Sequence, residues 1–199
     1  MSPSAVVPDW TVLVNKFVAL ADSSEHWETP EVGPSATDRI YRSNAGKIRY
    51  KAEFTLAVSP SSAADLLNCI PRRHEWDTLC AQAEKMGEVE GWTIMYICTH
   101  PQWPAQAREE VLWVGRRDTD DGIYLLGTTC DVFEYPVKGA GVKMRTAIGG
   151  SRIRAHKDGC IVTHLFDSDP GGLLPSYIVR KVSAVAVPKN IRLIRELAK

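Results

Sequence analysis

The 199-residue sequence predicts a single α+β domain, residues 1–199, in which an antiparallel sheet is covered by helices. Two observations lead to this class. A run of short segments rich in apolar and β-branched residues fills the middle of the chain, and turn-forming clusters separate them. The C-terminal end instead repeats its apolar residues at helical spacing. We find no internal repeat and no linker that would divide the chain.

Two helices are predicted in the first third of the chain. The first covers residues 12–20, with Asp9 as its N-cap. The second starts at Ser59, a capping residue followed by Pro60 in the first helical position, and Pro71 stops it. Each prediction depends on side-chain capping of free backbone N–H groups.

A hairpin is predicted between these helices. Residues 39–42 and 48–56 alternate apolar with charged side chains, which is typical of strands with one wet face. Residues 43–46, Ser-Asn-Ala-Gly, would form the turn.

Seven further strands are predicted with no helix among them, at residues 81–88, 92–99, 108–116, 122–130, 142–148, 151–156 and 160–166. Such regular spacing indicates an antiparallel meander. Residues 92–98 and 111–114 are apolar on both faces, so both faces of the sheet need covers. The second cover is either more protein, giving a thick core, or the wall of a cavity; the pattern leaves both open.

A long helix is predicted at the C-terminus, after the turn cluster 167–172, with Pro175 in its first position. Its length from residue 175 to 199 would be roughly 37 Å, enough to cross a small domain. Pro188 should kink or split it. The apolar side comprises Leu174, Ile178, Val182, Val185, Ile191, Ile194 and Ala198. A one-sided helix behind Gly171 and Gly172 could be a lid, or an ordinary packed terminal helix.

Charge and cysteine usage restrict the class of protein. The chain has 24 basic and 24 acidic residues, which argues against nucleic acid as a main partner. No apolar run reaches the 18 or so residues of a membrane span, and the N-terminus lacks the pattern of a signal peptide. Five cysteines without metal-ligand spacing indicate free thiols in a reducing compartment. We expect a soluble, cytoplasmic protein without a cofactor or metal.

Several motifs resemble the START family, the StAR-related lipid-transfer domains of the helix-grip group. They are Arg73-His74-Glu75-Trp76-Asp77, Arg108-Glu109, Val142-Lys143-Met144-Arg145, Gly150-Ser151-Arg152-Ile153, and Asp169-Pro170-Gly171-Gly172-Leu173-Leu174-Pro175-Ser176-Tyr177. Their order and separation match the family over essentially the whole chain.

The resemblance implies a helix-grip fold, a strongly curved antiparallel sheet of about nine strands around a long C-terminal helix. One lipid, a phospholipid or sterol, would lie in the tunnel between them. The loop 99–106 corresponds to the family's gate, together with the last helix hinged at Gly171 and Gly172. Trp103 in that loop suits a membrane interface, or it packs on the domain. The implied function is lipid transfer by a peripheral, monomeric protein that touches membranes transiently.

The resemblance also names candidate ligand contacts. Arg73 and Asp77 correspond to a pair beside the lipid phosphate in phosphatidylcholine-binding relatives, although the motif is also structural. Met95 and Val114 replace the acidic and basic residues of the sterol-binding branch, and Ile97 stands where a choline cage would need tryptophan. The expected lining comprises Arg73, Asp77, Met95, Ile97, Leu112, Trp113, Val114, Ile178 and Val182. The headgroup stays open.

Two alternatives to a carrier remain. The chain could be a lipid-sensing module of a larger protein, or an enzyme such as a cyclase, because the helix-grip fold also hosts catalysis. Glu110 could point inward and act as a base, but we expect it to reach solvent near the end of its strand. No hydrolase elbow or phosphate loop is present.

Overall fold

The computed structural model describes residues 6–24, 27–43, 48–131 and 141–199. One sheet dominates it, and its strands follow the order β1-β2-β3-β10-β9-β7-β6-β5-β4. The strands are β1 Glu31–Val32, β2 Arg39–Arg42, β3 Ile48–Leu56, β4 Cys80–Val89, β5 Trp92–Thr99, β6 Arg108–Thr119, β7 Gly122–Thr129, β8 Val142–Lys143, β9 Arg145–His156 and β10 Gly159–Asp169. The helices are α1 Trp10–Asp22, α2 Pro60–Asn68, the 3-10 turn Ile70–Arg72, α3 Arg73–Trp76 and α4 Ser176–Leu197.

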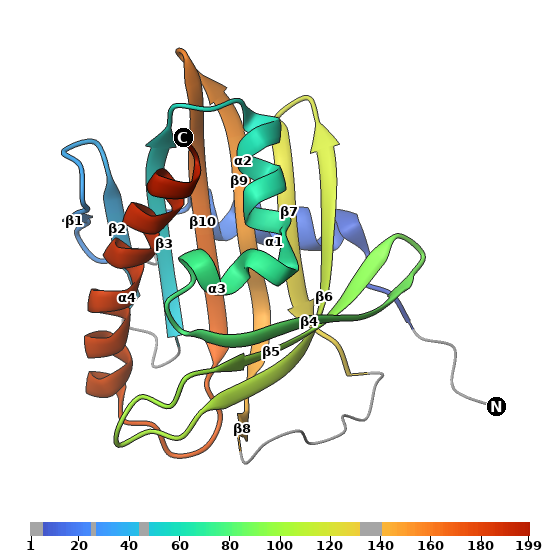
Figure 1. Cartoon of the computed structure of the whole chain (residues 1–199), viewed down its shortest axis with the longest axis vertical. Helices are drawn as coiled ribbons and strands as arrows, with labels where there is room; N and C mark the ends of the chain where they lie inside the picture. Colours follow the sequence, from blue (N-terminus) through green and yellow to red (C-terminus); the bar gives the residue numbers. More distant parts are fainter. Residues whose placement is uncertain (1–5, 25–26, 44–47, 132–140) are drawn as a thin grey trace.

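The predicted antiparallel arrangement is confirmed for the main strands. Each neighbouring pair on the path is antiparallel, and β3 joins the meander by pairing with β10, where Phe54 lies opposite Val162. The short β8 instead runs parallel to β6. The sheet curls, so that β4 and β5 pass beneath α3 while β3 and β10 stand beside α4 (Figure 1). The turn predicted at 43–46 lies largely outside the described residues.

One strand boundary was wrong. The segments 142–148 and 151–156 were predicted as two strands, but β9 runs unbroken from Arg145 to His156. Gly149 and Gly150 separate the two predicted strands, but Gly150 stays in the ladder at a φ of +142°. A β-carbon there would collide with the carbonyl oxygen of Leu125 on β7. Glycine therefore allows close strand approach here and does not end the strand.

Both predicted N-terminal helices are confirmed with their caps. The Asp9 carboxylate accepts hydrogen bonds from the backbone N–H of Thr11 at 2.7 Å and of Val12 at 3.2 Å. The Ser59 hydroxyl accepts one from the N–H of Ser62 at 3.1 Å. The 3-10 turn and the single-turn helix α3 were not predicted as helices, because one turn is too short for apolar periodicity to register.

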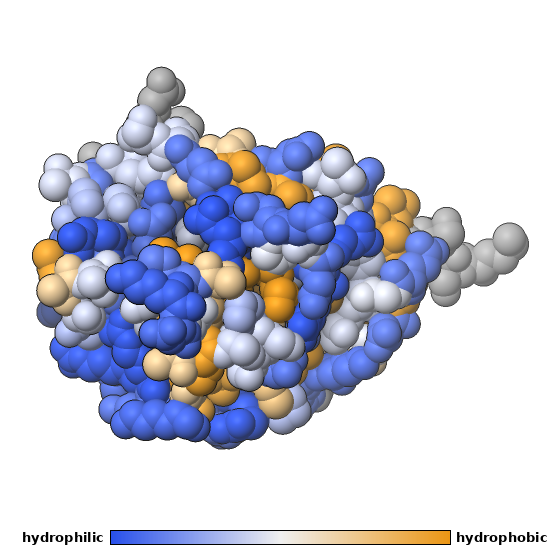
Figure 2. All heavy atoms as spheres, turned by 90° about the horizontal axis from the view of Figure 1, so that it is seen from above, coloured by the Kyte–Doolittle hydropathy of each residue, from blue (hydrophilic) through white to orange (hydrophobic). Residues whose placement is uncertain are grey.

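The helices lie on opposite faces of the curved sheet. Helix α1 packs on one face in a solid apolar cluster that includes Phe17 and Trp113. On the other face α2, α3 and α4 cover a second cluster. The end of the molecule shown in Figure 2 is mostly covered by hydrophilic residues, with hydrophobic patches between them.

Pro188 was predicted to kink or split the helix; α4 is continuous through Pro188, so it is not split into two helices. Its C-terminal half is held firmly: the Arg195 guanidinium donates to both carboxylate oxygens of the fully buried Asp38, at 2.5 and 2.8 Å. The Asn190 side chain accepts from the backbone N–H and hydroxyl of Thr78. Val185 was expected on the buried side but is 67% exposed, since the next residue, Ala186, takes the inward position.

Candidate functional site

A cavity lies between the concave face of the sheet, α4 and the loop that follows β5. Its volume is about 160 Å³. On the same measure one buried water needs only about 10–15 Å³. The segment leading into α4 contributes Leu174, and α4 itself contributes Ile178, Val182, Ala186 and Val187. The loop contributes Gln102, Ala105 and Gln106. Two smaller spaces, of about 80 and 20 Å³, share lining residues with it. The two segments predicted as a gate therefore both border the cavity.

Most of the residues predicted to contact the ligand border these spaces. Those on the largest cavity are Arg73, Asp77, Ile97, Leu112, Ile178 and Val182. Met95 and Val114 border the second space, which Arg73 and Leu112 also line.

Trp113 is the exception, and its predicted place in the cavity lining is wrong. It points to the opposite face of β6, where it is buried in the cluster under α1 together with Trp92 and Tyr96. Successive residues of a strand face opposite sides, so Leu112 and Val114 point inward and Trp113 cannot. The side chains of Trp92, Tyr96 and Trp113 are therefore not part of the cavity wall.

Arg73 and Asp77 form the predicted pair. The Arg73 Nε donates to Asp77 Oδ2 at 3.1 Å, and both side chains are mostly buried. The guanidinium also lies 5.0 Å from the ring centre of Trp76. The helical turn α3 thus presents a neutralised ion pair to the cavity.

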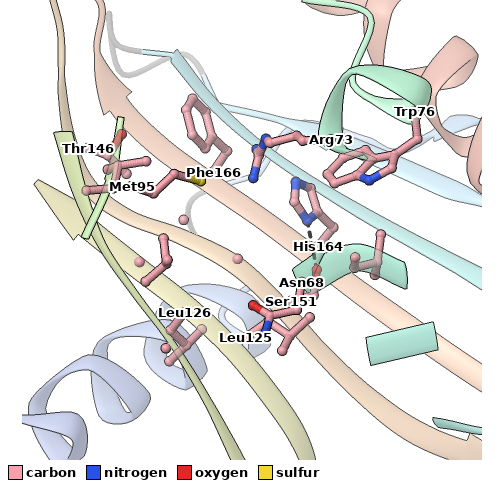
Figure 3. A pocket seen from close by; sticks show the side chains of 17 residues that line it. Asn68, Arg73, Trp76, Met95, Leu125, Leu126, Thr146, Ser151, His164 and Phe166 are labelled. Atoms are coloured by element: carbon pink, nitrogen blue, oxygen red, sulfur yellow. Dashed lines mark hydrogen bonds between the residues drawn. The ribbon is translucent and has the colours of Figure 1, made fainter. Parts of the chain in front are cut away.

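His164 is a polar residue of the site that sequence reasoning missed. It lies on β10, and its Nδ1 is 2.9 Å from the hydroxyl of Ser151 on β9 (Figure 3). Burial, reinforced by the Arg73 charge, lowers the pKa of His164 to about 4, so the ring is neutral at physiological pH. Tyr50 of β3 lies 5.9 Å away, ring centre to ring centre, and burial raises the pKa of its hydroxyl. Alternation with Val162 and Phe166 in the predicted strand could have placed His164 inward.

Glu110 does not reach solvent as expected. It is 1% exposed and borders the cavity, where its carboxylate accepts from the Thr129 hydroxyl at 2.5 Å and from the backbone N–H and hydroxyl of Thr146 at 2.6 and 2.7 Å. Burial raises the pKa of Glu110, and these hydrogen bonds oppose that shift. The prediction failed because the start of β6 is covered: Thr129 of β7 and Thr146 of β9 lie against the Glu110 carboxylate.

Arg108 ties the two gate segments together. Its buried guanidinium donates to the carbonyl oxygens of Gln106 at 2.6 Å, Pro170 at 3.1 Å and Gly171 at 3.5 Å. Gly171 and Gly172 have φ values of +64° and +60°, which suit glycine, and a β-carbon on Gly171 would collide with the carbonyl oxygen of Lys143. The turn before α4 is therefore held in one conformation by the Arg108 hydrogen bonds and by the two glycines.

The outer rim of this region is apolar. Trp103 in the loop is 94% exposed, so it is not packed on the domain, and Leu173 is completely exposed. Leu173 was not among the predicted gate residues. Within the described parts of the chain, no helix is long and apolar enough to cross a membrane. No three His, Cys, Asp or Glu side chains gather there as possible metal ligands.

Known structures share this architecture. Human STARD10 matches with a TM-score of 0.82 and 17% identity, covering 98% of this chain and 82% of its own. Human StAR-related lipid transfer protein 5 matches at 0.78 and 14%, covering 94% and 93%. A StAR-related lipid transfer protein fragment from Xanthomonas axonopodis matches at 0.73 and 19%, covering 87% and 99%. At such low sequence identities the likeness concerns the fold alone. It confirms the expected helix-grip architecture.

Comparison with curated protein sequences gives no match. The START domain family model, in contrast, matches residues 12–196, nearly the whole chain. The motifs around Arg73, Arg108 and Gly171 lie within that match. The chain therefore belongs to the START domain family.

Proposed function

We propose that the protein binds one lipid in the cavity beneath α4 and carries it between membranes. Membership of the START family supports lipid binding in general. The observation that carries the finer proposal is the largely apolar cavity between the concave sheet face and α4. It would work as a monomer in the cytoplasm, peripheral to membranes.

The energetics explain why such a carrier is needed. A two-chain lipid has about 30 methylenes, and exposing them to water costs about 0.8 kcal/mol each, more than 20 kcal/mol in total. Moving the chains from a bilayer into an apolar cavity costs little, because both environments are dry. The barrier therefore lies in opening the protein, which is least costly at the membrane surface.

The contacts of α4 suggest which part opens. Arg195 holds the C-terminal half to the buried Asp38, and Asn190 holds it to the half-buried Thr78. The described contacts of the N-terminal half include a surface ion pair between Arg180 and Glu28 at 2.8 Å, with Arg180 more than half exposed. Exposed Trp103 and Leu173 flank that end and would enter the lipid interface. We propose that this half of α4 and the loop 99–106 separate there, hinged at Gly171 and Gly172.

Filling the cavity tests the function. Val182→Trp places a large ring in the cavity, whereas Val185→Trp, three residues along the same helix, places it on the exposed side. We expect lipid to co-purify with the wild type and Val185→Trp in native mass spectrometry, and to be lost from Val182→Trp. Vesicle-to-vesicle transfer should follow the same order. Equal loading and transfer by both variants would contradict the proposal.

The same measurements separate the alternatives. A sensing module would retain lipid without moving it between vesicles. An enzyme would change the mass of its bound lipid during incubation, and Glu110 would be the residue to replace.

A further inference from the structure

The outward side of helix α4 carries a row of exposed residues. Steps of four or three residues separate them, so they share one side of the helix. Helix α4 contains five basic residues and one acidic residue, although the chain as a whole is neutral. Positive charge is therefore concentrated on this helix. The exposed row, which we call the outer face, consists of Tyr177, Lys181, Val185, Lys189 and Arg192.

The cations of the outer face are available to a partner outside the chain. No ion pair joins Lys181, Lys189 or Arg192 to another residue in the described part of the chain. Arg195, in contrast, turns inward and is paired with Asp38. The outer face therefore presents three uncompensated positive charges to its surroundings.

Exposed apolar side chains continue the outer face toward the gate. Eight large hydrophobic side chains are exposed among the described residues, and half of them lie on α4, on the turn before it or in the loop 99–106. Apolar and aromatic side chains beside cations are typical of a helix that lies in a membrane interface. A leaflet with anionic lipids offers hydrocarbon to the first kind and charged headgroups to the second. The four exposed residues are Trp103, Leu173, Tyr177 and Val185.

Arg180 lies beside the outer face and is held by an acidic residue at the edge of the sheet. Its Nη2 donates to both carboxylate oxygens of Glu28, at 2.9 and 2.8 Å. Glu28 is itself anchored to β2, because its backbone N–H donates to the carbonyl oxygen of Arg42 at 2.8 Å. The pair thus fastens the N-terminal half of α4 to the β1–β2 side of the molecule, beside which the helix stands (Figure 1).

The pair between Arg180 and Glu28 is weak enough to be exchanged. The Arg180 side chain is 55% exposed and that of Glu28 is 31% exposed, so water screens their attraction. Pairs of this kind shift an equilibrium constant by no more than about fivefold. An anionic leaflet attracts each nearby basic residue by about the same factor, and it attracts the outer-face cations together with Arg180. A phosphate also accepts paired hydrogen bonds from a guanidinium as a carboxylate does. Several cations acting together therefore outweigh the single ion pair.

We propose that the outer face of α4 docks on an anionic leaflet, and that an anionic lipid headgroup there replaces Glu28 as the partner of Arg180. In water the ion pair holds the N-terminal half of α4 closed. Docking removes this restraint at the surface where lipid is exchanged. The inference rests on the proposed function, because it supplies the signal for the opening proposed above. That signal is the surface charge of the membrane and not the identity of the carried lipid.

Co-sedimentation with vesicles tests the docking. One set of vesicles contains phosphatidylcholine alone, and the other also contains phosphatidylserine. We expect the wild type to bind the phosphatidylserine vesicles about tenfold more tightly or better. Lys181→Gln should weaken that binding about fivefold and leave binding to pure phosphatidylcholine unchanged. Lys85→Gln, at an exposed position of the opposite edge strand β4, is the matched control and should bind like the wild type.

A double-mutant cycle tests the exchange of partners. Glu28→Gln should strengthen binding to the phosphatidylserine vesicles about threefold, because the lipid no longer has to displace the acid. The same substitution in an Arg180→Gln background should have no effect, since the two residues act as one pair. An equal gain in both backgrounds would mean that Glu28 acts only through the general charge, and it would overturn the exchange. Glu88→Gln breaks another surface ion pair, with Lys85 at 2.7 Å, and should leave binding unchanged.

Two results separate this inference from the proposed function. Equal binding of the wild type to both kinds of vesicle overturns the docking, whether or not lipid co-purifies with the protein. If native mass spectra show no lipid in a protein that still prefers phosphatidylserine vesicles, the docking stands and the carriage of lipid is contradicted.

Discussion

The two faces of the sheet are built from the same strands, but one is densely packed and the other borders a cavity. On the α1 face the side chains form a solid apolar cluster with tilted and edge-on ring contacts, such as Trp10 on Trp92 at 4.9 Å and Phe17 on Tyr124 at 6.0 Å. On the α4 face the strands border a cavity and the smaller spaces beside it, and Glu110 and His164 are among the lining residues. One face supplies stability, and the other gives up packing to make room for a ligand.

The strand β6 contains this difference within a few residues. Val111 and Trp113 point into the solid cluster, while Glu110 and Leu112 border the cavity. Dense packing gains dispersion energy that a cavity wall forgoes. Substitutions that are chemically equal should therefore have unequal effects on the two faces.

The largest effect should come from removing a leucine on the solid face. Leu165→Ala, at a fully buried position, should lower the free energy of unfolding by about 4 kcal/mol, because the packed surroundings cannot collapse. Leu112→Ala, at the cavity, should lower it by about 2 kcal/mol, since one side of the residue already faces empty space. Urea denaturation of both variants measures the difference. Equal losses would show that the two faces are packed alike.

Low pH should destabilise the folded protein through His164, which lies on the cavity face. Its pKa is about 4 in the folded protein and about 6.5 when unfolded, so the unfolded state binds more protons in this interval. Stability is full above pH 6.5 and falls as the pH drops toward 4, by up to about 3 kcal/mol from this group. His164→Asn should remove that dependence. The difference between the two unfolding curves isolates His164 from the other titrating groups, with His156→Asn as the control that should match the wild type.

Removing the Arg108 hydrogen bonds that join the two gate segments should have an intermediate effect on stability. Arg108→Met keeps a side chain of similar length but removes three hydrogen bonds from a charged group to carbonyls, and we expect a loss of about 2 kcal/mol in stability. Lipid transfer between vesicles should become faster, because the closed state is less favoured. Slower transfer at unchanged lipid loading would contradict this role of Arg108. Gly171→Pro is a poor probe of the same hinge, because proline cannot adopt its φ of +64°.

The smallest effect on stability should come from the rim. Trp103→Ser changes a side chain that is 94% exposed, so the free energy of unfolding should stay within about 0.5 kcal/mol of wild type. Binding to vesicles, measured by sedimentation, should nevertheless weaken. A marked loss of stability would mean that Trp103 packs on the protein.

Much of this molecule follows from short stretches of its sequence. The caps Asp9 and Ser59, the alternating strands and the one-sided C-terminal helix are local patterns, and the structure confirms them. Predictions failed where distant residues decide the outcome. Trp113 was assigned to the wrong face, and Glu110 was expected in solvent, because neither register nor cover is visible in a strand read alone.

The sequence by itself determined the family, the elements and the apolar character of the lining, since these depend on composition and spacing along the chain. Tertiary structure alone decided where the cavity lies and which polar groups meet in it. The pairing of β3 with β10 brings Tyr50 and His164 together, and α3 sets Trp76 beside them. That convergence is a long-range property, because it depends on how the whole sheet bends around α4.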